Sequence, residues 1–303
     1  MTIALTGATG FVGRAVLDEA QRRGVTLRAL TRREQVAREG VQWVTGTLAD
    51  DGGLAHLVES ARAVIHVAGL TNSPDPADFH EANVVGTQKL LDACKAARAR
   101  RFVFVSSLSA REPRLSQYGH SKAEAEAIVQ SSGLDWTIVR PPGVYGPRDI
   151  DYFEMFRSAR LGLVPLPPRG ASSIIHVDDL AELLLDLVDA PPTLVRRKTF
   201  EPDDGREGGW SHSELAQAIG TAVGRRVFAP HLPRSVLSAA ARADRLLRGD
   251  KARLTADRVG YMTHPNWVAR SAMKVPETVW APRIRGEEGL AATARWYRAQ
   301  GWL

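Results

Sequence analysis

The sequence predicts an α/β fold in which a doubly wound parallel sheet is followed by a smaller C-terminal lobe. The first observation is an apolar, β-branched run, Thr2–Thr6, of the kind found in buried parallel strands. The second is a set of glycines, Gly7, Gly10 and Gly13, at three-residue spacing. A strand, a glycine turn and a helix in this order are typical of a parallel sheet with crossover helices. The helix is indicated by apolar residues that recur at helical spacing: Phe11, Val12, Ala15, Val16 and Ala20.

The composition is ordinary for a soluble globular chain. The 303 residues are 44% hydrophobic and 24% charged, which suffices for one large domain or one and a half. The formal net charge is +6, and arginine is spread along the whole length. This pattern favours a solvated basic surface over a nucleic-acid-binding arm, so no nucleic-acid partner is expected. A basic chain can still favour anionic ligands, including a phosphorylated cofactor.

Cysteine content and hydropathy indicate where the protein works. The single cysteine, Cys94, excludes an internal disulfide and suits a reducing compartment, so the expected location is the cytoplasm. No apolar run reaches the ~20 residues that a membrane span needs. The N-terminal run is expected to be a core strand and not a signal peptide. The oligomeric state stays open at this stage, with a homodimer as one alternative.

The glycine turn predicts a cradle for dinucleotide phosphates. Gly7 permits a tight turn, Gly10 lets a pyrophosphate approach the backbone, and Gly13 lets the helix pack closely on the strand. The helix N-terminus offers free N–H groups and the positive end of its dipole to the phosphates. The residues assigned to this cradle are Gly7, Thr9, Gly10, Phe11, Val12 and Gly13.

The spacing GxxGxxG resembles that of the short-chain dehydrogenase/reductase superfamily. The form GATGFVG resembles its extended branch, the NAD-dependent epimerase/dehydratase family, or the related atypical branch, which includes the NADPH-binding accessory subunit of respiratory complex I. The resemblance implies a Rossmann-like core, a nicotinamide dinucleotide cofactor and a small-molecule substrate. It extends by motif from Met1 to about Ala190 and weakly to the end of the chain.

Two arginines predict the form of the cofactor. A second strand, Val25–Leu30, ends in Thr31, Arg32 and Arg33. An NAD enzyme of this fold usually carries an acid there for the ribose 2′-OH, whereas an arginine suits the 2′-phosphate of NADP. We therefore expect NADP(H) as the cofactor, with NAD as the alternative if both arginines merely solvate a loop.

The resemblance extends to the adenine and ribose sites. The segment after a third strand, Val41–Val44, resembles the family's Gly-Asp-Leu-x-Asp, except that Thr47 stands where the family has Asp. A fourth strand, 63–68, resembles the VIHLAG that lines the cofactor's ribose, and its His66 is expected to be a structural residue and not a metal ligand. The cofactor residues that the resemblance adds here are Thr47, Leu48, Val67, Ala68 and Gly69.

A long helix is expected next, over Phe79–Ala97, with the family's N-x-x-G-T motif inside it. A fifth strand, Arg101–Val105, follows. The resemblance adds Asn83, from that motif, and Val105, at the end of this strand, to the cofactor site.

The residues that carry chemistry come after the fifth strand. Ser106 and Ser107 end it, at the edge where open α/β sheets place their sites. Tyr118 and Lys122 follow as Y-x-x-x-K, a spacing that puts both side chains on one helix face. A reductase needs a proton donor beside the carbonyl, and a lysine ammonium lowers the pKa of a phenol from its usual ~10. We assign Tyr118 as acid/base, Lys122 as its partner and a ribose ligand, and Ser107 to the substrate oxygen. Tyr118 is assigned to the cofactor site as well, together with Lys122.

The connection between these residues departs from the extended branch. Ser107 and Tyr118 are eleven positions apart, so the longer substrate-contacting insert of the sugar epimerases is missing. The short form resembles the atypical branch, some of whose members keep the fold and the cofactor with little or no turnover. A non-catalytic NADPH-binding accessory or assembly protein is therefore one alternative. A nucleotide-sugar epimerase or dehydratase is another, although the short connection argues against it.

A proline-rich segment after the sixth strand, Asp135–Arg140, resembles the extended branch's RPxxVYGP signature. The resemblance places Pro141, Pro142 and Val144 beside the nicotinamide. Residues 174–180 resemble the family's IHVDDLA, and Asp178 is expected to cap the helix that runs to Val188.

These observations predict a dinucleotide-binding domain over residues 1–147 and 172–200, and a smaller substrate-side domain over 148–171 and 201–303. The expected activity is NADP(H)-dependent reduction of a carbonyl, or oxidation of a secondary alcohol, on a small molecule. The complete Ser107–Tyr118–Lys122 set favours an enzyme over an accessory protein.

Overall fold

The computed structural model describes residues 2–73, 75–249, 252 and 254–303. Met1, where the family resemblance and the first predicted domain begin, lies outside the described residues, as do Pro74, Asp250, Lys251 and Arg253. The chain forms two compact units. The domain boundaries predicted from the sequence remain a prediction. The first unit comprises Met1–Arg140, Leu180–Phe200 and Val275–Trp280. The second unit comprises Pro141–Asp179, Glu201–Lys274 and Ala281–Leu303.

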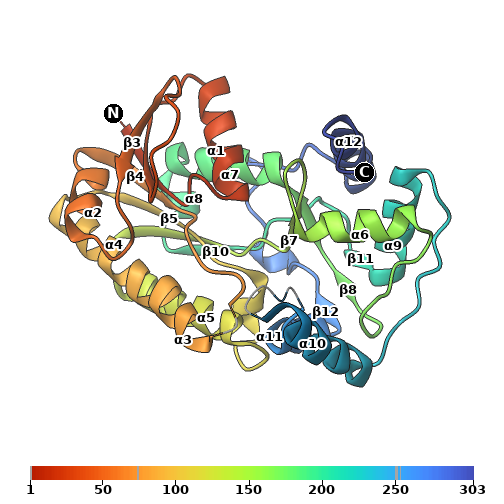
Figure 1. The fold of residues 1–303 in the computed structure, drawn as a ribbon. Coiled ribbons are helices and arrows are strands. Elements are labelled where there is room, and N and C mark those ends of the chain that lie inside the picture. The colour runs from red at the N-terminus through yellow and green to blue at the C-terminus, as the bar shows by residue number, and fades with distance from the viewer. Residues whose placement is uncertain (1, 74, 250–251, 253) are drawn as a thin grey trace. The chain divides into compact units, whose positions relative to one another are not determined.

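A seven-stranded parallel sheet forms the centre of the first unit (Figure 1). The strand order reverses between its first and fourth strands, and the carboxyl ends of strands at such a switch point are where open α/β sheets bind ligands. The predicted doubly wound, Rossmann-like fold is confirmed. In spatial order the strands are β10 (Lys198–Phe200), β6 (Asp135–Val139), β5 (Arg101–Val105), β4 (Ala61–His66), β1 (Thr2–Thr6), β2 (Leu27–Thr31) and β3 (Val41–Thr45).

Helices cover both faces of this sheet (Figure 1). On one face lie α1 (Phe11–Arg22) and α7 (Val177–Asp189), which are joined by an ion pair of 2.6 Å between Arg23 and Asp186. The other face is covered by α2 (Asp51–Val58), α4 (Gly86–Ala96) and α5 (Gln117–Ser131). A short helix, α8 (Pro192–Val195), precedes β10.

The core between the sheet and the second group of helices is apolar. Leu54 and Leu57 of α2, Leu90 of α4 and Phe102 of β5 are buried in one cluster. Cys94 lies in the same cluster, fully buried, and burial raises the pKa of its thiol to about 12. The thiol is therefore protonated and acts as a small apolar side chain.

The single helix expected over residues 79–97 is wrong in detail. The segment is α3 (Pro76–His80), then a π-helical stretch, Glu81–Val85, and then α4. The wider turn carries Asn83, whose side chain bonds to the backbone of Leu70 rather than to its own helix. A propensity pattern does not reveal such a tertiary contact.

The second unit is built from small sheets and helices. A parallel pair, β7 (Gly143–Tyr145) and β9 (Ile174–His176), begins it. A three-stranded sheet has the order β11 (Trp210–Ser211), β8 (Ala171–Ser172) and β12 (Asn266–Trp267).

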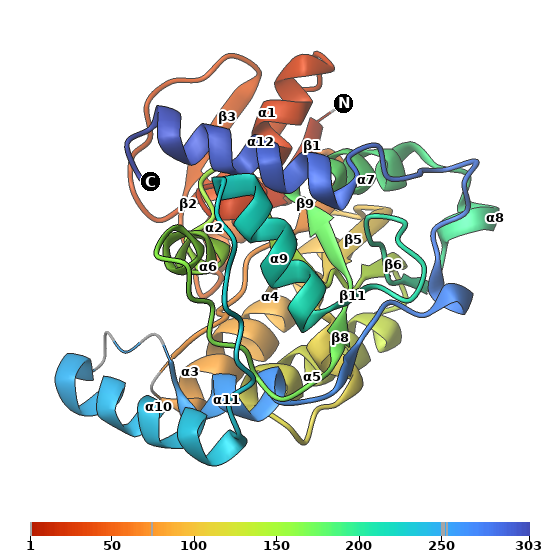
Figure 2. The ribbon, with the colours of Figure 1, turned by 90° about the vertical axis from the view of Figure 1, so that its right-hand side faces the viewer.

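Three helices of this unit, α6 (Asp151–Arg160), α9 (His212–Val223) and α12 (Gly286–Ala299), enclose an aromatic core (Figure 2). Tyr145, Phe156, Trp210 and Tyr297 are its largest buried side chains. A separate pair, α10 (Arg234–Arg248) and α11 (Ala256–Met262), packs through its own small apolar cluster.

The structure corrects one helix cap. Asp178 lies inside the first turn of α7, which begins at Val177, so it is not the N-cap. Its neighbour Asp179 instead accepts hydrogen bonds from the backbone N–H groups of Arg283 and Ile284, at 3.2 and 3.0 Å.

Within the described part of the chain, no helix combines the length and the apolar character that crossing a bilayer requires.

Candidate functional site

The glycine turn after β1 is fixed by close backbone packing. Gly7 has φ +73°, and a Cβ atom there would lie 2.6 Å from the backbone N of Ala68. A Cβ atom at Gly13 would collide with the carbonyl oxygen of Gly7. At Gly10 a Cβ atom would lie 3.3 Å from the carbonyl oxygen of Gly7, a tight contact but a milder one than at Gly7 or Gly13. The absence of a side chain at Gly10 would also let a ligand approach the backbone there.

The start of α1 supplies donors beside this turn. α1 begins at Phe11, and Gly10 is its N-cap in extended conformation without a side-chain hydrogen bond. The first N–H groups of a helix have no partner inside it, so those of Phe11, Val12 and Gly13 are available to an anion. The carbonyl of Thr9 accepts from Nε of Arg14 at 3.0 Å. These residues fit the pyrophosphate of a dinucleotide.

Arg32 and Arg33 follow β2 directly at the same end of the sheet. Both side chains are exposed, and neither guanidinium has an ion-pair partner among the described residues. The bend is held by Thr31, whose hydroxyl donates to the carbonyl of Arg33 at 2.7 Å. Both cations are therefore free to meet an anionic ligand.

Thr47 and Leu48 follow β3. The hydroxyl of Thr47 accepts from the backbone N–H of Ala49 at 3.1 Å, so it shapes the turn. Leu48 packs against Gly86, where a Cβ atom would lie 2.9 Å from the Leu48 Cβ atom. Leu48 is half-buried, while Thr47 is exposed.

His66, at the end of β4, is a structural residue, as its sequence context predicts. Thr6 Oγ1 donates to its Nδ1 at 2.6 Å, and its Nε2 donates to Thr87 Oγ1 at 2.9 Å. This direction follows because the Thr87 hydroxyl donates onward to the carbonyl of Asn83 at 2.6 Å. Burial, aided by the charge of Lys122, lowers the pKa of His66 to about 3, so the ring is neutral.

Asn83 connects the loop after β4 to α5. Its Oδ1 accepts from the N–H of Leu70 at 2.7 Å, and its Nδ2 donates to the carbonyl of Leu70 and to Ser121 Oγ, each at 2.9 Å. The Ser121 hydroxyl in turn donates to the carbonyl of Tyr118 at 2.9 Å. Gly69 lies at the same place, since a Cβ atom on it would be 3.1 Å from Asn83 Oδ1 and 3.7 Å from Lys122 Nζ. Sequence reasoning assigned Asn83 to the cofactor and missed this link.

Lys122 is a buried cation at the carboxyl end of β5. Its Nζ donates to the carbonyl of Val105 at 2.8 Å and lies 4.3 Å from the centroid of the Phe104 ring. Burial lowers the pKa of Lys122 to about 8, an effect that the carboxylate of Glu126 opposes. A lysine with such a pKa can respond to a neighbouring phenol and to a bound ligand near neutral pH.

Tyr118 lies in the first turn of α5, one turn before Lys122. Its half-buried ring packs against Phe79, with centroids 6.2 Å apart. The helix is capped by Ser116, which accepts from the N–H of Gly119 at 2.9 Å. A Cβ atom at Gly119 would lie 2.7 Å from the carbonyl oxygen of Ser109, so the chain after β5 packs directly on this turn.

Ser107 caps the short 3-10 segment Leu108–Arg111 that connects β5 to α5. Its Oγ accepts from the N–H and the hydroxyl of Ser109, at 3.2 and 2.9 Å. The structure therefore places Ser107 and Lys122 at the same edge of the sheet. Ser107 is two residues after Val105, and the carbonyl of Val105 accepts a hydrogen bond from Lys122.

Sequence reasoning missed a buried ion pair beside this set. Glu126 lies one turn after Lys122 on α5 and is 4% exposed. Its carboxylate accepts two hydrogen bonds from Arg140, at 2.8 and 2.6 Å, and one from the hydroxyl of Ser106 at 2.5 Å. The four-residue spacing indicated only that Glu126 shares a helix face with Lys122, and no sequence signal pointed to Arg140 as its partner.

Pro141, Pro142 and Val144 belong to the second unit, where Val144 lies in β7. Their predicted place beside the nicotinamide stays a prediction. The neighbouring Gly143 is required by packing, because a Cβ atom there would collide with the hydroxyl of Tyr152.

Among the described residues, no three His, Cys, Asp or Glu side chains gather in a way that could hold a metal ion.

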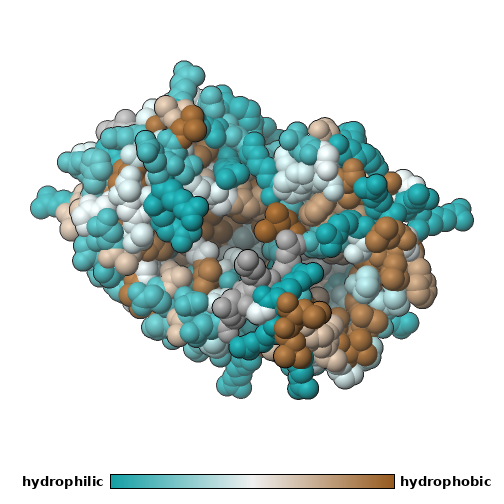
Figure 3. Space-filling view, viewed as in Figure 1, coloured by the Kyte–Doolittle hydropathy of each residue, from teal (hydrophilic) through white to brown (hydrophobic). Residues whose placement is uncertain are grey.

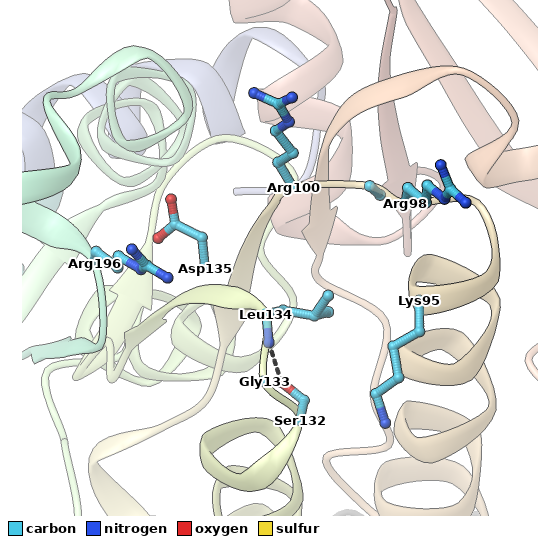
Figure 4. Close-up of a pocket in the computed structure, with 9 residues that line it drawn as sticks. Lys95, Arg98, Arg100, Ser132, Gly133, Leu134, Asp135 and Arg196 are labelled. Atoms are coloured by element: carbon cyan, nitrogen blue, oxygen red, sulfur yellow. Dashed lines mark hydrogen bonds between the residues drawn. The ribbon is translucent and has the colours of Figure 1, made fainter.

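A cavity of about 480 Å³ lies at the opposite end of the sheet, where β5 and β6 begin (Figure 4). None of the predicted site residues lines it. The lining is Lys95, Arg98, Ala99, Arg100, Ser132, Gly133, Leu134, Asp135 and Arg196.

The family model described as NAD(P)H-binding matches residues 7–191 of this chain. The chain is 33% identical to the ceramide reductase of Caulobacter vibrioides, over 99% of this chain and 96% of that protein. It is 23% identical to the UDP-glucose 4-epimerase of Vibrio cholerae, over 77% of this chain and 79% of that protein.

Solved structures share the whole fold. The crystal structure of gox2253 superposes with a TM-score of 0.78 at 24% identity, covering 100% of this chain and 99% of that one. MoeE5 in complex with UDP-glucose and NAD superposes with a TM-score of 0.77 at 21% identity, covering 99% of each chain.

The fold and the sequence matches together define a nicotinamide-dinucleotide-binding oxidoreductase. The chain belongs to the extended short-chain dehydrogenase/reductase family, also called the NAD-dependent epimerase/dehydratase family, whose NAD(P)H-binding domain it carries. The sequence-based recognition of this family and of an NAD(P) cofactor is confirmed.

Proposed function

We propose that this protein is an NADPH-dependent ketoreductase whose substrate is a small amphiphilic ketone with a long hydrocarbon chain. The observation that carries the proposal is the set of Ser107, Tyr118 and Lys122 at the carboxyl end of β5, with a buried lysine whose pKa is about 8. Arg32 and Arg33, exposed beside the glycine turn, support the choice of NADPH over NADH.

The proposed substrate class rests on the relatives. The similar proteins bear the names ceramide reductase, a ketoreductase of a farnesyl-substituted dihydroquinoline oxide, and 2-alkyl-3-oxoalkanoate reductase. Each name combines a reduction with a hydrocarbon substituent or a lipid. The ceramide reductase also aligns over nearly its whole length, including the second unit of this chain.

The residues would divide the work as follows. A bound nicotinamide dinucleotide supplies a hydride for the carbonyl carbon. Tyr118 donates its phenolic proton to the carbonyl oxygen, and the Ser107 hydroxyl donates a hydrogen bond that holds the same oxygen. The Lys122 ammonium stabilises the phenolate that remains and donates to the cofactor ribose. Gly7–Gly13 and the start of α1 hold the pyrophosphate, and Arg32 and Arg33 hold the 2′-phosphate.

The test is reduction of a ketone panel by the wild type and by Tyr118→Phe. The panel contains long-chain 3-oxo lipids and short ketones, and UDP-glucose is offered with NAD⁺ as the epimerase arm. We expect NADPH oxidation with a long-chain ketone, and we expect Tyr118→Phe to lower kcat by about 10²–10⁴, the usual contribution of a positioned general acid. NADPH affinity and folding should be nearly unchanged.

Three results would contradict this proposal. Epimerisation of UDP-glucose without net NADPH oxidation would assign the protein to the sugar epimerases. Tight NADPH binding without turnover of any ketone would favour the non-catalytic alternative, in line with the 29% identity to the photosystem II assembly factor Ycf39 of Cyanophora paradoxa. Full activity of Tyr118→Phe would refute the assigned proton donor.

A further inference from the structure

Glu126 of α5 is a buried carboxylate to which the proposed reaction assigns no step. It is 4% exposed, as is Lys122 on the same helix. Figure 3 shows that hydrophilic side chains cover much of the visible face of the molecule, where water surrounds them. Buried charges such as Glu126 and Lys122 are screened much less by water and salt. A carboxylate in this position is costly to bury, so its partners and its effect on Lys122 need an explanation.

Three hydrogen bonds fix the Glu126 carboxylate. Its Oε1 accepts from the hydroxyl of Ser106 at 2.5 Å and from Nε of Arg140 at 2.8 Å, and its Oε2 accepts from Nη2 of Arg140 at 2.6 Å. The backbone of both partners is fixed in turn. The N–H of Ser106 donates to the carbonyl of Val139 at 2.7 Å, and that of Arg140 donates to the carbonyl of Phe200 at 2.8 Å. Since all three side-chain partners donate, the carboxylate is held as an ionised acceptor at the carboxyl ends of β5 and β6.

Lys122 lies one turn before Glu126 on the same face of α5. Its Nζ donates to the carbonyl of Val105 at 2.8 Å rather than to the carboxylate, so Glu126 acts on it through space. Burial lowers the pKa of Lys122, and the charge of Glu126 raises it in part. Because an ammonium has three donors, it can hold the Val105 carbonyl and still donate to groups that enter the site.

Glu126 is the one buried carboxylate among the described residues of α5 and of the elements packed against it. His66 of β4 and Cys94 of α4 are buried but neutral, because burial lowers the pKa of the first to about 3 and raises that of the second to about 12. The remaining titratable side chains on these elements are exposed or half-buried, the half-buried ones being Tyr118 and Glu124 of α5, Lys89 of α4, Arg111 of the 3-10 segment and Asp135 of β6.

We propose that Glu126 is a positioning residue of the site: its carboxylate, fixed by Arg140 and Ser106, keeps the Lys122 side chain charged at the end of β5. This inference rests on the proposed function, in which the Lys122 ammonium acts on Tyr118 and on the cofactor ribose. Glu126 acts only through Lys122 and is not itself a catalytic residue.

NMR titration of the lysine ε-carbons in the full chain tests the proposal, with Lys122 assigned as the signal that Lys122→Met removes. Glu126→Gln keeps the shape of the side chain but removes its charge, so the midpoint of the Lys122 titration should fall by about one pH unit. At pH 8 this lowers the charged fraction of Lys122, and with it kcat for ketone reduction, about fivefold, whereas kcat at pH 6 should hardly change.

The direction of the shift separates this role from a merely structural one. Loosening of the structure would admit water and raise the Lys122 midpoint, whereas loss of the Glu126 charge lowers it. Glu126→Asp retains the charge and should titrate closer to the wild type than Glu126→Gln does. Breaking a buried ion pair also costs stability. Glu126→Gln with Arg140→Gln replaces the pair by two neutral amides, and its Lys122 midpoint should likewise lie below that of the wild type.

Glu124→Gln is the matched control, because it makes the same chemical change on the same helix at a side chain that is 40% exposed. Its Lys122 midpoint should stay within about 0.2 pH units of the wild type. A midpoint that Glu126→Gln raises or leaves unchanged would overturn the proposal, and so would an equal fall in Glu124→Gln. Because the titration needs no turnover, a failure to reduce ketones would refute the proposed function and leave the result for Glu126 readable.

Discussion

A buried cation at the carboxyl end of the central sheet contrasts with a group of exposed cations at its amino end. At the carboxyl end, Lys122 is buried, bonded to the carbonyl of Val105 and lowered in pKa to about 8. At the amino end, Lys95, Arg98, Arg100 and Arg196 surround an open cavity and are all exposed (Figure 4). Exposed cations also lie at the carboxyl end, where Arg32 and Arg33 follow β2, so the buried Lys122 is what distinguishes the end at which the chemistry is expected.

The difference teaches that burial changes what a cation can do to a neighbouring group. The interactions of an exposed cation with other charges are screened by water and salt. A cation held by a carbonyl in an apolar setting exerts a strong field on the next group that enters. Substitutions at the two ends of the sheet can therefore be compared directly.

The largest effect is expected for Lys122→Met. Met approximates the volume of the buried side chain but removes the ammonium, so kcat for ketone reduction should fall by at least about 10²-fold and the affinity for NADPH should fall as well. Stopped-flow reduction assays and fluorescence titration measure the two losses. Thermal unfolding should show a folded protein, because an apolar side chain replaces a buried charge.

The wild-type pH profile sharpens the same comparison. Because the Lys122 pKa is lowered to about 8, the ammonium is present below that pH and lost above it. The rate of reduction should therefore decline as the pH rises through about 8, and this limb should be absent from the residual activity of Lys122→Met. A wild-type rate that stays flat between pH 7 and 10 would contradict the assigned role.

An intermediate effect is expected for Arg32→Ala. Loss of a charge-assisted contact to the 2′-phosphate costs about 1.5–3 kcal/mol, which corresponds to about a 10- to 150-fold weaker binding of NADPH. Binding of NADH should hardly change, since it lacks that phosphate. Arg33→Ala, titrated in parallel, shows which guanidinium makes the contact. Equal affinity of the wild type for NADH and NADPH would refute the predicted preference.

The smallest effect is expected at the amino end of the sheet. Lys95→Met and Arg196→Ala remove exposed cations from the cavity lining, and we expect kcat and NADPH affinity to stay within about twofold of the wild type. Lys95→Met is the matched control for Lys122→Met, because the chemical change is identical. A large loss of activity in Lys95→Met would contradict the expectation that only the buried lysine, Lys122, acts in the reaction.

The fold could be predicted because its signals are local. Each central strand is a short apolar run, and Gly7 and Gly13 are glycines for reasons of backbone packing that recur wherever a strand, a turn and a helix meet this closely. Family recognition rested on the same local motifs. The positions of Ser107 after β5 and of Tyr118 and Lys122 one turn apart on α5 could be predicted from spacing, whereas their joint catalytic role stays a prediction.

The rest depends on contacts between distant segments. The π-helical turn at Asn83 exists because its side chain bonds to Leu70, and the ion pair of Glu126 with Arg140 joins α5 to the end of β6. Nothing in the residue types of Leu70 and Arg140 identifies them as the partners of Asn83 and Glu126. The buried side of α10 was also hidden, because its alanines, leucines and arginines are typical of any helix; the structure shows that Leu237 and Ala241 pack against Val259 of α11.

The buried thiol of Cys94 can report how often the core beside the sheet opens. A thiol that is fully buried and protonated cannot react with an alkylating reagent while the core is closed. Every labelling event must therefore follow an opening of the contact between α4 and the sheet. Since the chain has one cysteine, the fraction of labelled protein at a given time reports the rate of such openings without interference from another thiol. The rate of core opening can thus be measured on the unmodified protein, without an introduced probe.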